Sequence, residues 1–188
     1  YYPNVPTNYV IVNNSQSCYD LVYHIGKKGA KNIALLTTDV HLYVMKQRIE
    51  GYRKALRDLN LSNDLSLEVF VDRQNYKMDI VDKLDYLFSE LPNVDGFFFS
   101  THYLALEAIR YFIERNIDYK TKFQMGCFHE TTSLDILAPR MSISRMPIHE
   151  MGVESVKILL ESIQDKEADY KAVVLDNELL PSGYSKDP

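Results

Sequence analysis

The sequence lacks several features that would assign a chain quickly to a functional class. It has no apolar run of membrane-spanning length and no basic-then-apolar start of the signal-peptide kind. It holds only two cysteines, Cys18 and Cys127, both inside predicted secondary structure. They are interpreted as small buried side chains in a reducing compartment rather than as a disulfide framework. We therefore expect a cytoplasmic location and no contact with a membrane.

Basic charge and catalytic motifs are also scarce. The chain carries 21 Lys and Arg against 26 Asp and Glu, a net charge of −5, so it is a poor candidate for a surface that grips DNA phosphates. It contains no glycine-rich phosphate loop, nucleophile elbow or metal-ligand helix. The spacing of Cys127 and His129, taken with His102, is not a recognised zinc pattern. We expect no catalysis, no cofactor and no bound metal.

The sequence does contain alternating strands and helices. Its 188 residues are 46% hydrophobic and 25% charged, which suits a globular core. Strands are predicted at residues 9–12, 32–37, 67–71, 96–100, 123–128 and 141–144 and within 171–180, and helices at 15–28, 41–60, 76–91, 103–116 and from Pro147 onward. The last helix is expected to bury Ile148, Met151, Val156, Leu159, Leu160 and Ile163. This alternation predicts an α/β fold of parallel sheets flanked by helices.

Polar side chains follow the predicted strands, where ligands bind in such folds. Arg48 lies near the start of the helix that follows the strand at 32–37, and a buried arginine there needs an oxygen-rich partner. The strand-end set suits a polyhydroxyl ligand, which needs paired donors and a flat apolar face. Its members are Asn13, Asn14, Thr38, Asp39, His41, Asp72, Arg73, Tyr76, Ser100, Thr101, His102, His129 and Glu130.

Three motifs in order resemble one known family. The first is Arg48-x-x-Gly51-Tyr52-x-x-Ala55-Leu56, and the second spans residues 94–108, a strand and polar turn followed by Leu104-Ala105-Leu106-x-Ala108. The third joins Phe128-His129-Glu130 to residues 137–147 and to Glu150-Met151-Gly152. Each motif is weak alone, but together they resemble the effector-binding domain of LacI/GalR transcriptional regulators over almost the whole chain.

The resemblance implies two Rossmann-like lobes of the periplasmic-binding-protein type. Residues 1–188 would form one effector-binding and dimerisation domain. Residues 1–38 would be the remainder of the N-terminal lobe, 39–145 mostly the C-terminal lobe, and 146–188 the crossover helix and closing strands. The family's N-terminal helix-turn-helix and the first units of its N-terminal lobe have no counterpart here, so the natural protein is expected to be longer.

The resemblance also implies roles for single residues. Arg48 matches the arginine that grips sugar hydroxyls, with a structural ion pair as the alternative. Thr101 falls where the family usually has asparagine, His102 where it has aspartate, and His129 replaces a common ligand-binding aspartate. These departures could favour an acidic or phosphorylated ligand, make binding sensitive to pH, or mark an altered site in which His129 is merely structural. Tyr76 lies near an aromatic stacking position, although it could be ordinary packing.

Two further expectations concern weaker candidates and partners. Asp39 and His41 are weaker ligand candidates. Leu104, Leu106, Ile109 and Leu137 are candidates for a homodimer interface, or they simply cover the sheet.

Three hypotheses about function remain open. The first is the regulatory part of a transcription factor that senses a small sugar-like effector and contacts DNA only through a helix-turn-helix outside this chain. The second is a solute-binding or sensor domain for a sugar, and the third is a small α/β enzyme.

Overall fold

Strands and helices alternate along the chain, as the sequence predicts. The computed structural model describes residues 5–165 and 169–182. The strands are β1 (Tyr9–Val12), β2 (Ile33–Thr37), β3 (Glu68–Phe70), β4 (Gly96–Phe99), β5 (Gln124–Phe128), β6 (Ser142–Arg145), β7 (Ala172–Leu175) and β8 (Glu178–Leu180). The helices are α1 (Asn14–Lys27), α2 (Tyr43–Asp58), α3 (Tyr76–Glu90), α4 (His102–Glu114), α5 (Tyr119–Lys122), α6 (Thr132–Leu137) and α7 (Ile148–Gln164), and a 3-10 turn, η1 (Leu65–Leu67), precedes β3. The predicted strands and long helices are confirmed, with small shifts at their ends.

Two separate sheets organise these elements. A six-stranded sheet has the order β3-β2-β4-β5-β6-β8, and a two-stranded sheet pairs β1 with β7. Neighbours run parallel except β6 and β8, which are antiparallel. This confirms the α/β class. We call the six-stranded sheet with its helices α1 to α6 the body, and β1, β7 and α7 the arm.

The division between the two units differs from the expected one. β2 lies inside the body sheet, between β3 and β4, and α1 packs on the same sheet. The chain therefore passes from arm to body near Asn13, and the expected assignment of residues 1–38 to one lobe is corrected. Short apolar strands look alike in sequence whichever sheet they join, so the pattern could not place this boundary.

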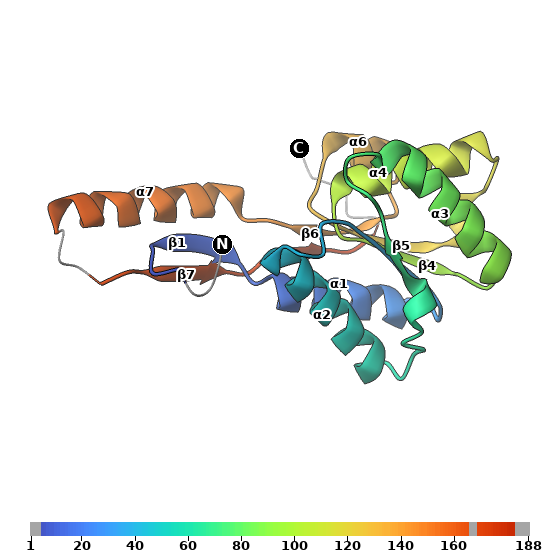
Figure 1. The fold of residues 1–188 in the computed structure, drawn as a ribbon, viewed down its shortest axis with the longest axis horizontal. Helices are drawn as coiled ribbons and strands as arrows, with labels where there is room; N and C mark the ends of the chain where they lie inside the picture. Colours follow the sequence, from blue (N-terminus) through green and yellow to red (C-terminus); the bar gives the residue numbers. More distant parts are fainter. Residues whose placement is uncertain (1–4, 166–168, 183–188) are drawn as a thin grey trace.

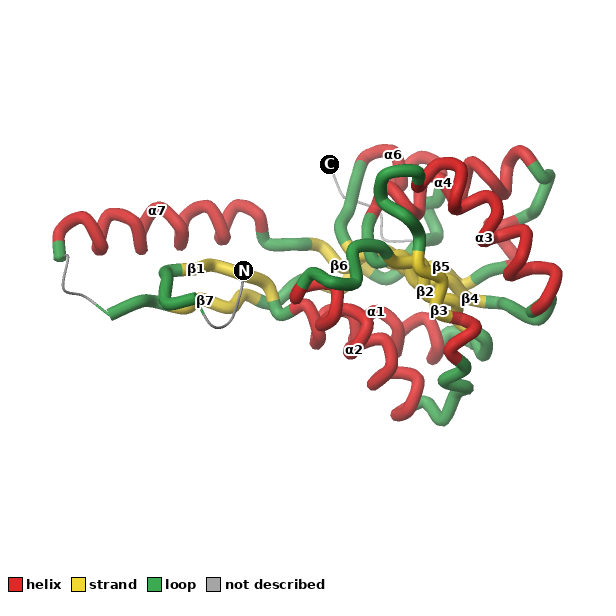
Figure 2. The backbone as a smooth tube through the Cα atoms, in the orientation of Figure 1, coloured by secondary structure: helices red, strands yellow, loops and turns green. Residues whose placement is uncertain are grey.

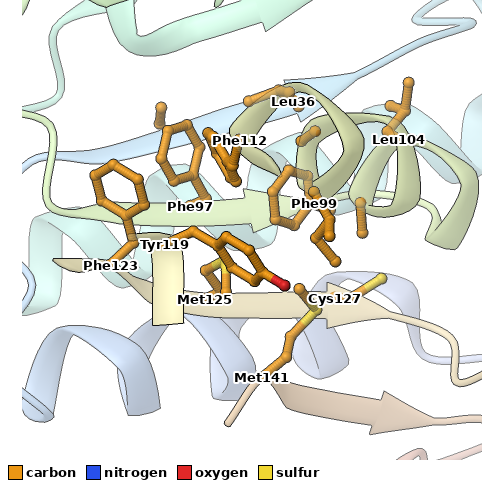
Figure 3. Close-up of a cluster of buried hydrophobic side chains, with 14 of the residues drawn as sticks. Leu36, Phe97, Phe99, Leu104, Phe112, Tyr119, Phe123, Met125, Cys127 and Met141 are labelled. Carbon is orange, nitrogen blue, oxygen red and sulfur yellow. The ribbon is translucent and has the colours of Figure 1, made fainter. Parts of the chain in front are cut away.

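The body has a core on each face of its sheet. Successive side chains of a strand point to opposite faces. Phe97 and Phe99 of β4 accordingly enter the core that includes α3 and α4, and Phe98 enters the core that includes α1 and α2. Figure 2 shows these helix pairs on opposite sides of the sheet, and Figure 3 shows Phe97 and Phe99 among other buried side chains. Coverage on both faces explains why the body strands are apolar throughout.

Gly51 lets α2 approach α1 closely. A Cβ atom at Gly51 would meet the carbonyl oxygen of Ser15 and lie 3.0 Å from the Cβ atom of Cys18. The next residue, Tyr52, is fully buried, and its hydroxyl donates to the carbonyl oxygen of Ile33 at 2.7 Å. These contacts fix α2 against α1 and β2. Arg48, one turn earlier in α2, is thereby held beside the start of α1.

In the arm, the two-stranded sheet covers only one side of α7. Figure 1 shows α7 lying along the β1–β7 pair and extending away from the body. Ile158 is buried and Met151 packs partly against the body core. The other side chains expected to be buried are exposed: Ile148, Val156, Leu159, Leu160 and Ile163. That expectation was wrong because a two-stranded sheet shields a single face of a helix whose apolar side chains extend onto a second face.

Candidate functional site

The carboxyl ends of β2, β4 and β5 lie side by side because these strands are neighbours in the parallel sheet. Several buried polar atoms gather at this edge without a hydrogen-bond partner among the described residues. They are Oγ1 of Thr37, Thr38 and Thr101, Oγ of Ser100 and Nδ1 of His129. Buried polar atoms in folded proteins are nearly always paired. Their concentration here marks the edge as the candidate site for a polar ligand with its water.

Arg48 projects from α2 to this edge. Its Nε donates to Oδ1 of Asn14 at 2.9 Å, and its Nη1 donates to the carbonyl oxygen of Ser100 at 2.6 Å. Its guanidinium carbon lies 3.6 Å from the centroid of the Phe128 ring. The alternative ion pair with an acidic residue is not formed within residues 5–165 and 169–182, and Nη2 makes no hydrogen bond there. Burial lowers the pKa of Arg48, but an arginine keeps its charge.

His102 and His129 form a pair of imidazoles at the ends of neighbouring strands. Their ring centroids are 5.3 Å apart. His129 has φ of 81°, a left-handed conformation that is uncommon for residues other than glycine. Burial lowers the pKa of His102, and the neighbouring His129 lowers it further. The neutral form of His102 is therefore favoured in the folded chain.

The N-terminus of α4 completes the edge. Thr101 is the residue before the helix, and its side chain makes no capping hydrogen bond. The first N–H groups of a helix have no partner within the helix and carry partial positive charge. Together with the guanidinium of Arg48, they place several hydrogen-bond donors along the edge.

Three other ligand candidates were predicted from the sequence: Tyr76, Asp39 and His41. The Tyr76 ring meets Tyr103 edge-on, with centroids 5.1 Å apart, and Tyr103 lies next to His102. Asp39 has φ of 48°, and its carboxylate accepts from Nη1 of Arg73 at 3.3 Å. His41 is exposed. Sequence reasoning missed Phe128 and Tyr103, because contacts between aromatic rings leave no motif in a sequence.

The structure corrects two of the interface candidates. Leu104 and Ile109 are fully buried in the core of the chain itself, so they offer no surface to a partner. Leu106 packs partly against the same core, and Leu137 is 37% exposed. The helical period of α4 marks its apolar side chains but does not separate those that cover the sheet from those that face outward.

Other chemistries find little support in the described part of the chain. Cys18 and Cys127 are free and fully buried, and burial raises the pKa of Cys18 to about 12. No group of three or more His, Cys, Asp or Glu residues among residues 5–165 and 169–182 is placed to hold a metal ion. Over the same residues, none of the helices has the length and apolar character needed to cross a membrane.

The fold and the strand-end site define an α/β ligand-binding domain. Residues 22–181 match the periplasmic binding protein-like domain family, and the chain belongs to that family. It is similar to the HTH-type transcriptional regulator RegA of Clostridium saccharobutylicum, with 22% identity over 91% of this chain and 51% of RegA. The chain thus spans about half the length of the curated relatives it matches.

Solved structures of regulators share the fold. The "transcriptional regulator CelR-cellobiose complex" has a TM-score of 0.83 and 21% identity, over 95% of this chain and 54% of that chain. A regulatory protein of the LacI family from Chloroflexus aggregans has a TM-score of 0.85 and 18% identity, over 98% of this chain and 66% of that chain. The resemblance that the three motifs indicated is confirmed.

Proposed function

We propose that this chain is the effector-binding region of a cytoplasmic, DNA-binding transcriptional regulator that senses a small carbohydrate-like effector. The observation that carries the proposal is the edge around Arg48, where a fixed guanidinium lies among buried hydroxyls that lack partners. The name of RegA as a transcriptional regulator supports the regulatory role, and the cellobiose complex of CelR supports a carbohydrate ligand. DNA would be contacted by a helix-turn-helix outside this chain.

Arg48 is the proposed anchor of the effector. Asn14 and the Ser100 carbonyl hold two edges of its guanidinium, which leaves Nη2 to donate to ligand hydroxyls. Thr101, His102, His129 and Tyr76 would line the ligand, with Asp39 and its Arg73 partner at the margin. A planar fork of donors recognises adjacent hydroxyls in a way that lysine cannot copy.

Asn14 connects this site to the arm. It begins α1 directly after β1 and Asn13, so the Arg48–Asn14 hydrogen bond lies at the junction between arm and body. We assign the body to the C-terminal lobe and the arm to part of the N-terminal lobe. A ligand that binds one arrangement of the lobes more tightly shifts their population by its difference in affinity. In a dimer, that shift would change the spacing of the DNA-binding heads.

Fluorescence anisotropy of the full-length protein on DNA from upstream of its own gene tests the regulatory role. Sugars that raise the melting temperature are added to the complex, and the DNA affinity is expected to change by about fivefold or more. Sugar binding without any change in DNA affinity would contradict the regulatory role. DNA binding that no sugar or sugar derivative alters would contradict the sensing role.

Substitutions at Arg48 test the anchor. Arg48→Lys is expected to weaken sugar binding in calorimetry by at least about tenfold, or 1.4 kcal/mol, because the planar fork is lost while the positive charge is kept. Lys46→Ala, at an exposed position of the same helix, is the matched control and should bind normally. Arg48→Ala also removes the contacts to Asn14 and Ser100, so it should lower the melting temperature as well. Normal sugar binding by Arg48→Lys would exclude the anchoring role.

The second candidate function is a solute-binding or sensor domain for a sugar. The matching family is described as a periplasmic binding protein-like domain, and this description supports the alternative. The same anisotropy experiment separates the two functions, because a solute-binding protein would bind sugar without binding DNA. Cell fractionation would show in which compartment the full-length protein is located.

We also propose that a second copy of the chain packs against the α3–α4 edge. A groove there is lined by Lys77, Met78, Val81, Asp82, Glu107 and Arg110. Met78 is 76% exposed, and Leu106 and Leu137 are the remaining interface candidates from the sequence. Sedimentation velocity of wild type and of Met78→Asp measures whether a dimer forms and depends on this edge.

A further inference from the structure

The candidate site carries positive charge that no described carboxylate neutralises. The hydrogen bonds of Arg48 go to neutral oxygens of Asn14 and Ser100. The acidic residues at the same strand ends already have arginine partners. Asp39 binds Arg73 at 3.3 Å, and Glu130 binds Nε of Arg145 at 2.9 Å. A cation held in partly desolvated surroundings favours an anionic partner, because Coulomb attraction strengthens as water is excluded.

Three further features of the edge also favour an anionic ligand. The uncapped N-terminus of α4, a helix of 13 residues, points its first N–H groups at the edge. Oγ of Ser100 and Nδ1 of His129 are buried there without partners among the described residues, and Ser100 is fully buried. His102 and His129, whose ring centroids are 5.3 Å apart, add two imidazole rings that donate hydrogen bonds. These groups suit charged oxygens better than the hydroxyls of a neutral sugar.

We propose that the effector is an anionic carbohydrate whose carboxylate or phosphoryl group lies against His102, His129 and the start of α4, while its hydroxyl groups meet Arg48. The inference rests on the proposed sugar-sensing function and narrows its ligand class. The acidic group offsets the positive charge that Arg48 gives to this edge and favours the protonated form of His102, whereas a neutral sugar does neither. Oxygens of the acidic group accept the hydrogen bonds that the first turn of α4 leaves open.

Isothermal titration of the full-length protein with glucose, gluconate and glucose 6-phosphate is the first test. Gluconate carries a carboxylate on an open hydroxylated chain, and glucose 6-phosphate carries a phosphoryl group on the glucose ring. The two anions therefore distinguish a carboxylate from a phosphoryl ligand. At least one anion is expected to bind more tightly than glucose by about tenfold or more. Tighter binding of glucose than of both anions would overturn the inference.

Sulfate provides a second test that needs no knowledge of the natural effector. Its charge stays constant across the working pH range, and chloride at equal ionic strength is the reference salt. Sulfate is expected to raise the melting temperature of wild type above the chloride value. His129→Asp should lose this increment, because it places a negative charge at the edge. The left-handed φ of 81° at residue 129 is tolerated by aspartate.

His149→Asp is the matched control. His149 is exposed at the start of α7, so the same change of charge there should leave the sulfate increment intact. If His129→Asp folds poorly, His129→Asn keeps the backbone preference, removes the imidazole, and should reduce the increment. An equal sulfate response in wild type, the residue-129 variant and His149→Asp would overturn the inference, whichever of the three sugars binds.

The two proposals fail in different ways. If neutral sugars alter DNA binding while sulfate acts equally on wild type and His129→Asp, the anionic ligand is excluded and the sensing function stands. If the anions bind through His129 but leave DNA affinity unchanged, the anionic site stands and the regulatory output is excluded.

Discussion

The body and the arm follow the same sequence rules but reach different degrees of burial. In the body, helices cover both faces of the sheet, and Phe97, Phe98 and Phe99 are all fully buried. In the arm, a two-stranded sheet covers one side of α7, and Leu159 and Ile163 remain 58% and 63% exposed. The comparison teaches that periodicity identifies apolar side chains, whereas burial also requires a second surface to cover them.

The difference should appear in how each region responds to the same substitution. A fully buried side chain contributes both its transfer from water and its packing contacts, so its removal leaves a cavity. An exposed apolar side chain contributes little of either kind. Matched pairs of variants, one in the body and one in the arm, therefore test this difference in burial.

Phe98→Ala and Leu160→Ala form the pair with the largest expected contrast. Phe98 is fully buried between the sheet and α1–α2 and stacks on Tyr52, with ring centroids 6.2 Å apart. Its removal should lower the free energy of unfolding by about 3–5 kcal/mol. Leu160 is 54% exposed, and its removal should change stability by less than about 0.5 kcal/mol. Urea denaturation measures both values. A loss at Leu160 as large as that at Phe98 would mean that another surface covers α7 in solution.

Gly51→Ala and Gly152→Ala form a pair with opposite expected signs. A Cβ atom at Gly51 would press on the Ser15 carbonyl and force α2 away from α1, so we expect a loss of about 1–3 kcal/mol. At Gly152 in α7 nothing lies within 4 Å of an added Cβ atom. Alanine there should add about 0.5–1 kcal/mol, because it loses less backbone freedom than glycine in a helix. Thermal melts of both variants measure the signs, and stabilisation by Gly51→Ala would refute the close helix contact.

The sequence predicted those parts of the fold that depend on local patterns. The strand at 9–12 was predicted with its full extent, and the helix at 15–28 was predicted to within one residue at each end. The short helices α5 and α6, of four and six residues, were missed, because so few residues show no apolar period. The exposure of α7 and the burial of Leu104 depend on which surfaces meet, and local patterns do not contain that information.

The candidate site shows the same limit. The strand-end rule of α/β sheets brought Asn14, Ser100 and His129 into one predicted set, and the structure places them around the edge that Arg48 reaches. The ligand roles of these residues stay predictions. The ring of Phe128 under Arg48, by contrast, could not be foreseen. This contact depends on how α2 packs relative to the sheet, which only the folded backbone fixes.

The pH dependence of stability gives the smallest expected effect and compares a histidine of the site with one of the arm. The folded pKa of His102 lies below its ordinary value of 6.5, because burial and then His129 disfavour the charged ring. Between the folded and the ordinary pKa, the unfolded chain therefore binds more protons than the folded chain. The contribution of His102 to stability is present at pH values above the ordinary pKa. It is lost as the pH falls through the pKa of the folded state. His24, whose pKa burial also lowers, acts in the same direction.

Urea denaturation across this pH range should thus show wild-type stability falling on acidification. His102→Gln should flatten the fall, and His149→Gln, at the exposed start of α7, should leave it unchanged. An unaltered slope in His102→Gln would contradict the assignment. Sulfate at constant ionic strength should reduce the acid loss in wild type and less so in His102→Gln, because an anion beside the imidazole favours its protonated form. This result would link the charge of the site to the stability of the body. The substitution in the arm would leave the pH dependence of stability unchanged.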